Sequence, residues 1–157
     1  MRRSHALLTL GLPVLLLATW AGAVPASAAS ASPVLIEAPT PFGGDGTFTA
    51  TGDAVCPSGT TTEVFNFGTG SERSRAFTFH VVKTFTCDDG SGTFTVRLDA
   101  VVRPCNPTDV GSWVVVGGTE QYAGLRGAGT LVGTYFPGDA CSAEGVVDRL
   151  SGMMVTR

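Results

Sequence analysis

The sequence lacks the signatures of several common enzyme classes. Only 15% of its 157 residues are charged, and it holds two histidines, His5 and His80. It has no Gly-x-Ser-x-Gly turn, which argues against a serine hydrolase of the α/β kind. It has no Cys-x-x-Cys pair, which argues against a structural zinc site, and no lysine-bearing phosphate loop. No metal or cofactor is therefore expected.

Helical periodicity and clusters of basic residues are missing as well. Beyond residue 28 the apolar residues follow a period of two, the pattern of half-buried β-strands. Acidic and basic side chains are scattered and the net charge is −3, so neither a nucleic acid nor an anionic membrane is an expected partner. The acidic pair Asp88-Asp89 predicts a hairpin turn, since the spaced ligands of a calcium-binding EF-hand are absent.

Residues 1–28 have the features of a secretory signal peptide. Arg2 and Arg3 precede an apolar run over 6–24, and small residues follow it. We predict cleavage after Ala28, with Ala31 as an alternative site. The mature chain would then carry 8 basic and 13 acidic side chains, a net charge of −5, and would be secreted without stable membrane association. Retention of the run as a membrane anchor is the other interpretation, because its length would allow it.

Four cysteines follow the leader, and an even number in an exported chain predicts two disulfides. If consecutive strands alternate in direction, Cys56 and Cys87 lie at one end of the sheet, and Cys105 and Cys141 lie at the other. Crossed pairings would exceed the Cα separation of roughly 7 Å that a disulfide tolerates. We therefore predict the bridges Cys56–Cys87 and Cys105–Cys141.

The alternating runs predict an antiparallel β-sandwich or barrel with no helices. A single domain is expected over 47–157. It is preceded by a flexible segment over 29–46 that holds at most a short strand near 34–37. Turn-forming residues separate the predicted strands, which are 47–54, 61–67, 76–87, 93–103, 112–116, 128–136, 145–150 and a possible 153–156.

Lys83 stands out within the predicted hairpin 76–103. It shares one face of its strand with four apolar side chains, Phe77, Phe79, Val81 and Phe85, whereas His80 lies on the outer face. A charge on the inner face is costly unless it is paired or hydrated. We expect a cross-strand partner in Glu63, placed on the same face as Phe65 and Phe67 of the preceding strand. Such a pair could orient a polar ligand or transfer protons; otherwise Lys83 reaches solvent from a barrel rim.

A glycine-rich connection joins two of the predicted strands. It reads Val116-Gly-Gly-Thr-Glu-Gln-Tyr122-Ala-Gly-Leu-Arg-Gly-Ala-Gly129, with no helix behind it to bind a dinucleotide. We interpret it as a sharp sheet corner. Tyr122 would pack over the barrel end with its hydroxyl on a backbone group, and Arg126 would bind a ligand carboxylate or pair with Glu120.

This connection resembles that of allene-oxide-cyclase-like and dirigent-like barrels. The flanking Cys56-Pro-Ser-Gly59 and Phe85-Thr-Cys87-Asp-Asp-Gly-Ser-Gly-Thr-Phe94 are similar to those of small secreted bacterial proteins in that group. The resemblance covers roughly 45–155. It implies an all-β, antiparallel up-and-down, calycin-like barrel of about eight strands whose lumen holds a hydrophobic small molecule. Glu120 departs from the pattern, which usually has glycine there.

Three functions are compatible with these observations. The first is binding of a small hydrophobic or amphipathic ligand in the lumen, with Lys83, Glu63, Tyr122 and Arg126 as candidate ligand-binding residues. The second, implied by the resemblance, is an enzyme that guides cyclisation or coupling of a reactive intermediate, for which no catalytic residue is assigned. The third is an extracellular interaction module with a filled core. An eight-stranded barrel can be filled or can hold a small ligand, so the fold alone does not choose among the three functions.

Overall fold

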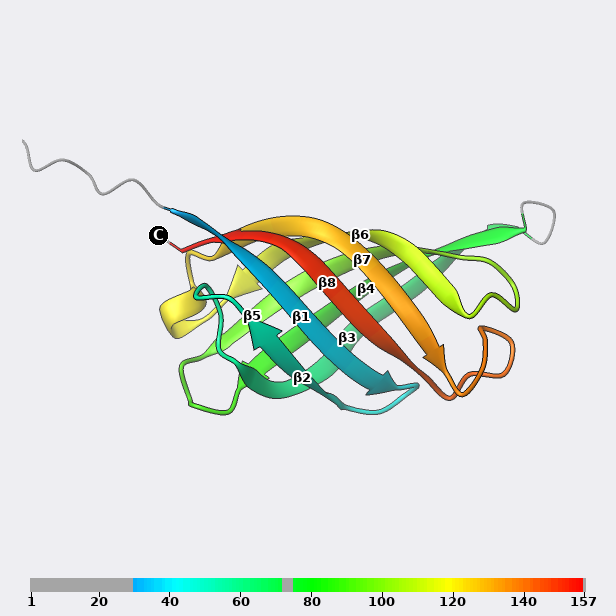
Figure 1. Ribbon diagram of the computed structural model, residues 1–157, viewed down its shortest axis with the longest axis horizontal. Coiled ribbons are helices and arrows are strands. Elements are labelled where there is room, and N and C mark those ends of the chain that lie inside the picture. The colour runs from blue at the N-terminus through cyan, green and yellow to red at the C-terminus, as the bar shows by residue number, and fades with distance from the viewer. Residues whose placement is uncertain (1–29, 72–74, 157) are drawn as a thin grey trace, which may run out of the picture.

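A computed structural model of the protein describes residues 30–71 and 75–156, which form an all-β structure with one short 3₁₀ helix (Figure 1). The predicted signal peptide, 1–28, lies outside these residues. The strands are β1 (Ala31–Pro41), β2 (Gly46–Thr51), β3 (Ser58–Ser71), β4 (Ala76–Cys87), β5 (Thr93–Val102), β6 (Thr108–Gly118), β7 (Arg126–Phe136) and β8 (Gly145–Val155), and the helix η2 (Glu120–Tyr122) lies between β6 and β7.

The eight strands form one closed barrel in chain order. Each strand pairs antiparallel with the next, and β1 pairs with β8 from Ala31–Val155 to Pro41–Gly145 to complete the ring. The predicted antiparallel up-and-down barrel is thus confirmed. Within the described part of the chain, no helix has the length and apolar character that crossing a membrane requires.

Alternating burial, clearest in β5, separates the lumen from the outer wall. In β5, Phe94, Val96 and Leu98 are buried, whereas Arg97 between them is exposed. The pairing of β4 with β5 sets Phe85 opposite Phe94 and Val81 opposite Leu98, as the predicted hairpin required. The period of two therefore identifies the inward face, since successive side chains of a strand point to opposite sides.

Aromatic rings fill one end of the lumen, which we call the closed end. Phe85 and Phe94 stack with ring centroids 4.8 Å apart, and Phe48 meets both edge to face. Tyr122, carried by η2, packs on Phe94 at 5.7 Å. Such pairs add to the hydrophobic contribution of their buried area. This half of the lumen is a packed core.

Two glycines explain part of the glycine-rich sequence. Trp113 is buried in the lumen, and its indole lies over Gly129 of β7 and Gly152 of β8. A Cβ at Gly129 would come within 2.7 Å of the indole nitrogen, and one at Gly152 within 2.6 Å of the ring. Glu120 has a φ of 52°, in the left-handed region that favours glycine. The glycines on β7 and β8 therefore make room for the Trp113 indole. The corner itself turns through Glu120, whose backbone conformation is strained for a residue other than glycine.

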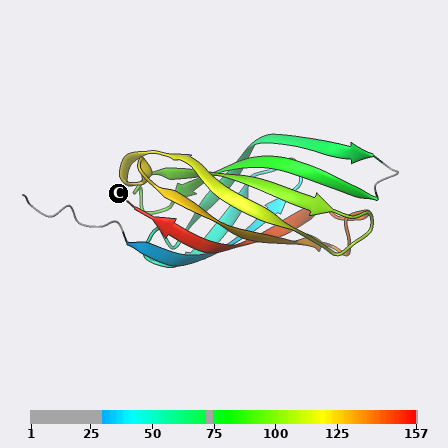
Figure 2. The same ribbon diagram turned by 90° about the horizontal axis from the view of Figure 1, so that it is seen from above.

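The two disulfides lie at opposite ends of the barrel and have the predicted pairing. Cys56–Cys87 joins the loop after β2 to the end of β4 at the closed end. Cys105–Cys141 joins the β5–β6 loop to the β7–β8 loop at the other end, which we call the open end. The β3–β4 hairpin projects beyond the other strands at the open end (Figure 2).

The predicted flexible segment over 29–46 is wrong in its main part, because 31–41 form strand β1. This strand pairs along its whole length with β8 but with β2 only over Leu35–Glu37. Its prolines occupy alternate outward positions outside the segment paired to β2, so their missing N–H groups fall on one edge of the strand. Because prolines argue against a strand, the sequence did not predict the whole of this strand, which closes the barrel. The two segments predicted over 145–150 and 153–156 are likewise one strand, β8.

The Cys56–Cys87 bridge should stabilise the fold chiefly by restricting the unfolded chain, since it closes a loop of 31 residues. We expect Cys56→Ala/Cys87→Ala to lower the free energy of unfolding by about 3–4 kcal/mol, measured by urea denaturation. Cys105→Ala/Cys141→Ala, which opens a 36-residue loop at the other end, is the matched comparison. A loss under about 1 kcal/mol in both variants would contradict the chain-entropy explanation.

Candidate functional site

A cavity of about 120 Å³ occupies the open end of the lumen. Its wall is largely apolar, and its polar side chains come from several strands of the ring. The lining residues are Thr40, Phe42, Glu63, Asn66, Phe79, Val81, Lys83, Leu98, Ala100, Val102, Asp109, Leu131, Tyr135, Val146 and Asp148. The lumen is thus filled at the closed end and hollow at the open end.

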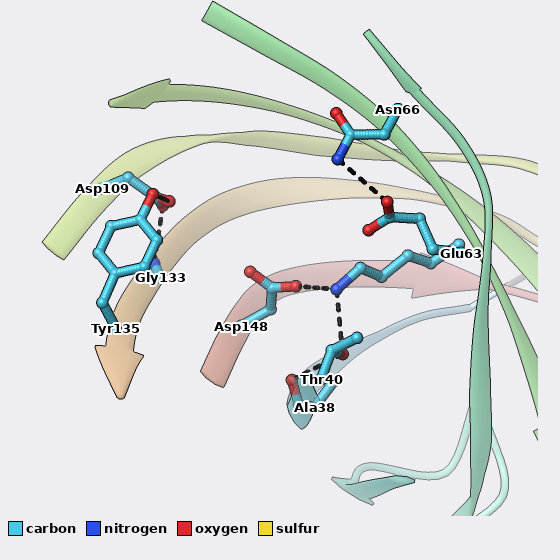
Figure 3. Close-up of polar contacts among 9 residues, drawn as sticks. Ala38, Thr40, Glu63, Asn66, Asp109, Gly133, Tyr135 and Asp148 are labelled. Atoms are coloured by element: carbon cyan, nitrogen blue, oxygen red, sulfur yellow. Dashed lines mark hydrogen bonds and ion pairs between the residues drawn. The ribbon is translucent and has the colours of Figure 1, made fainter. Parts of the chain in front are cut away.

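Lys83 extends into this cavity from the inner face of β4 and forms a buried ion pair with Asp148 of β8. The lysine is 2% exposed and the aspartate 4%. Lys83 Nζ donates to Asp148 Oδ2 at 2.5 Å and to Thr40 Oγ1 at 3.1 Å, and Thr40 in turn donates to the carbonyl of Ala38 (Figure 3). The predicted cost of a charge on this face is therefore offset by a carboxylate, although not by the one expected.

The surroundings of Asp148 act on the pKa of its carboxyl in opposite directions. Burial raises the pKa of the Asp148 carboxyl above its ordinary value, and the negative charges of Asp109 and Glu63 act in the same direction. The Lys83 ammonium opposes them. Asp148 therefore lies where proton exchange is sensitive to small changes in its surroundings.

A second polar cluster joins β6 to β7. Asp109 Oδ1 accepts a hydrogen bond from the Gly133 N–H at 3.0 Å, and Oδ2 accepts one from the Tyr135 hydroxyl at 2.8 Å (Figure 3). A Cβ at Gly133 would lie 2.4 Å from Asp109 Oδ1, so glycine is required for this contact. Burial, followed by the hydrogen bond to Asp109, raises the pKa of Tyr135 well above its usual value. The phenol therefore stays neutral and able to donate.

Glu63 lines the cavity but is not the partner of Lys83. The two residues are opposite each other in the β3–β4 register, yet the exposed Glu63 accepts a hydrogen bond from Asn66 Nδ2 at 3.0 Å. A β-bulge between Glu63 and Phe65 shifts the alternation. Phe65 consequently lies on the outer wall, 53% exposed, so the prediction that it shares a face with Glu63 is wrong.

Tyr122 and Arg126 lie away from the cavity, at the closed end. Tyr122 is 3% exposed, and its hydroxyl contacts the side chains of Ser91 at 3.0 Å and Gln121 at 2.6 Å, where a backbone partner was predicted. Arg126 is exposed, and the ion pairs of the described residues do not include one between it and Glu120. Of the four candidate residues, the structure brings together Lys83 and Glu63 alone.

Sequence reasoning missed Thr40, Asp109, Tyr135 and Asp148. A signal for Asp148 was present, because it alternates in phase with Val146 and Leu150 in a predicted strand. Thr40 was hidden in the segment predicted to be flexible. His80, predicted on the outer wall, lies there and contacts Asp99 at 2.6 Å.

One grouping of potential metal ligands occurs in the described residues, formed by Cys105, Asp139 and Cys141. Both of its sulfur atoms are joined in the disulfide and cannot act as thiolate ligands.

Comparison of the chain with protein-family models, with curated proteins and with solved structures finds no match.

The Lys83–Asp148 pair should behave as a coupled unit. We expect Lys83→Met and Asp148→Leu each to lower the free energy of unfolding by about 3–5 kcal/mol, because each leaves a buried charge without its partner. The double variant should lose clearly less than the sum of the two, as measured by urea denaturation. Additive losses would show that the two side chains do not interact in solution.

Tyr135 should make stability depend on alkaline pH. Its folded pKa is raised from the ordinary 10.0, so its contribution to stability is complete below pH 10.0 and falls as the pH rises further. We expect Tyr135→Phe to remove part of this alkaline loss, measured as the free energy of unfolding against pH. Tyrosinate absorbance that appears near pH 10.0 in the folded protein and is absent from the variant would contradict the prediction.

Proposed function

We propose that the protein is secreted and binds a small amphipathic molecule in the open end of its barrel. The observation that carries the proposal is a buried Lys83–Asp148 ion pair on the floor of an apolar-walled cavity. A ligand would place its apolar part against the wall and its polar end on this pair. Small-molecule sites commonly combine an apolar lining with a few polar groups that orient the ligand.

The ion pair supports ligand binding because stability alone is a weak reason for it. Removing two charges from water costs several kcal/mol for each ion, and apolar residues of similar volume are often as stable or more so. Asp148 Oδ1 accepts no hydrogen bond from a described residue and so remains available to a ligand in the cavity. An ion pair beside a cavity is better suited to binding a ligand than to filling the core.

The cavity volume limits the size of the enclosed part of the ligand. Drug-sized ligands fill roughly 300–1,000 Å³, whereas a cavity of about 150 Å³ suffices for one benzene ring. At about 120 Å³, the lumen is smaller than that cavity and encloses a short alkyl chain or part of a single ring. A larger hydrophobic molecule would project from the open end past Phe42, which is 56% exposed.

Export is supported by the leader and by the two disulfides, which fit an oxidising environment. Membership of the allene-oxide-cyclase-like and dirigent-like barrels is part of the same proposal and is supported by the quoted motifs. The eight-stranded closed barrel is the architecture that the resemblance implies.

An acid–base enzyme of the isomerase or cyclase kind is the second candidate. The observation that favours it is Asp148, a buried carboxyl with a raised pKa inside the cavity and next to an ammonium group. A carboxyl whose pKa is raised by burial can act as a general acid or base. Asp148→Asn would then abolish turnover while leaving ligand binding measurable. A module with a wholly filled core is disfavoured by the hollow at the open end.

Filling the cavity should weaken binding. Ala100 lines the cavity, and its neighbour Val101 lies on the outer wall, 41% exposed. We expect benzyl alcohol to shift amide resonances of residues around the cavity, and Ala100→Leu to weaken its binding by about tenfold or more. Val101→Leu is the matched control and should bind normally.

Two results would contradict a site in the lumen. Shifts confined to the outer wall, or equal affinity in the two variants, would exclude the lumen as the site. Because added volume costs roughly 1–3 kcal/mol in a packed region, the amide spectrum of Ala100→Leu must first show a folded barrel. Val81→Leu is the alternative variant if it does not.

A further inference from the structure

The charges around the cavity do not balance. Among the described lining residues, three are acidic, and Lys83 is the one basic side chain. Its ammonium is neutralised by Asp148 at 2.5 Å. The other two carboxylates, Asp109 and Glu63, have only neutral hydrogen-bond partners within the described residues: the Gly133 amide and Tyr135 hydroxyl for Asp109, and the Asn66 amide for Glu63. The cavity therefore carries an excess of negative charge.

Asp109 makes this imbalance costly for the protein alone. It is 6% exposed, so it is shielded from the water that normally solvates a carboxylate. Neutral donors recover part of that solvation but supply no opposite charge. A cation entering the cavity would supply it, and the low polarity of the surroundings would strengthen the attraction.

The floor of the cavity also offers an unused acceptor. Asp148 is 4% exposed and uses Oδ2 for Lys83, whereas its Oδ1 accepts no hydrogen bond from any described residue. Figure 3 shows this second oxygen pointing away from the ion pair. Among the described residues the fully enclosed side-chain polar atom without a partner is Thr61 Oγ1, so Asp148 Oδ1 is open to the cavity and can accept a further hydrogen bond. A ligand that carries N–H donors fits this position.

Aromatic side chains border the same space at its mouth. Phe42 and Tyr135 meet edge to face with ring centroids 6.4 Å apart, and both line the cavity together with Phe79. Ammonium groups are attracted to the faces of such rings within about 6 Å. The rings would also accept the apolar part of the ligand.

We infer that the ligand is a small organic cation, an alkyl- or arylalkylammonium ion. This inference rests on the proposed lumen site and names its chemistry. The ammonium group donates to Asp148 Oδ1 and lies in the negative field of Asp109 and Glu63, and the hydrocarbon part packs on the apolar wall. Carboxylate ligands are disfavoured, because the single ammonium that could bind them is already paired.

Three probes of equal size and different charge test the inference: benzylamine, which is an ammonium ion at neutral pH, benzyl alcohol and benzoate. Each is titrated into the purified protein at low ionic strength, and affinity is read from amide resonances of residues around the cavity. We expect benzylammonium to bind about tenfold or more tightly than benzyl alcohol, benzoate to bind most weakly, and the preference to shrink as salt is added.

The outcomes separate this inference from the proposed function. If benzyl alcohol or benzoate binds in the lumen as tightly as benzylammonium, the lumen site stands and the cation preference is wrong. If none of the three binds in the lumen, the proposed function fails and the inference fails with it.

Charge-neutral variants locate the preference. Glu63→Gln/Asp109→Asn keeps the shapes of both side chains, and we expect it to weaken benzylammonium binding about tenfold while changing benzyl alcohol binding less than about twofold. Asp89→Asn/Glu120→Gln removes two exposed charges at the closed end and is the matched control, which should change neither affinity. Glu63→Gln alone, on an exposed side chain, should weaken benzylammonium binding severalfold even if the double variant does not fold. Equal effects of the two double variants would overturn the inference.

Discussion

Closure of the barrel between β1 and β8 is the constraint on which the site depends. An open sheet would leave both strands with unpaired edges and Lys83 facing solvent or an incomplete core. The antiparallel pairing of β1 with β8 sets Ala38 beside Asp148 and brings Thr40 to the same inner surface. Lys83, on β4 at the opposite side of the ring, then reaches both residues across the lumen. The ion pair is thus a product of ring closure.

The two halves of the lumen are lined by the same alternating strands, but one is filled by side chains and the other is hollow. At the closed end, aromatic rings and Trp113 fill the interior, and glycines on β7 and β8 give the indole its space. At the open end, shorter apolar side chains such as Ala100 and Val102 line the wall, and the interior stays hollow. One disulfide lies at each end of the barrel. Together with the packed half, the two bridges stabilise the fold, so the hollow half can contribute little to stability. A stable barrel and a hollow site can therefore coexist in a chain of this size.

Much of the architecture was predictable because it depends on local properties. The period of two in β4 and β5, the turn residues between them and the positions of the four cysteines led to the barrel and to both disulfides. Prediction failed where a local rule had an exception. The strand β1 was not predicted in full, because its prolines argue against a strand. They are nevertheless tolerated at alternate positions of a strand with limited pairing. A bulge at Glu63 reversed the faces of Phe65 and Phe67, and bulges leave no reliable sequence signal.

By itself, the sequence determined that Lys83 faces inward among apolar residues, because side-chain direction in a strand follows from position alone. It also determined that such a lysine needs a carboxylate. Which carboxylate it meets was decided only by the tertiary structure. Glu63 is the cross-strand neighbour, but Asp148, 65 residues away in the chain, lies across the lumen at hydrogen-bond distance. Contacts through the interior of a barrel depend on strand tilt, register and closure together, and these are properties of the whole ring.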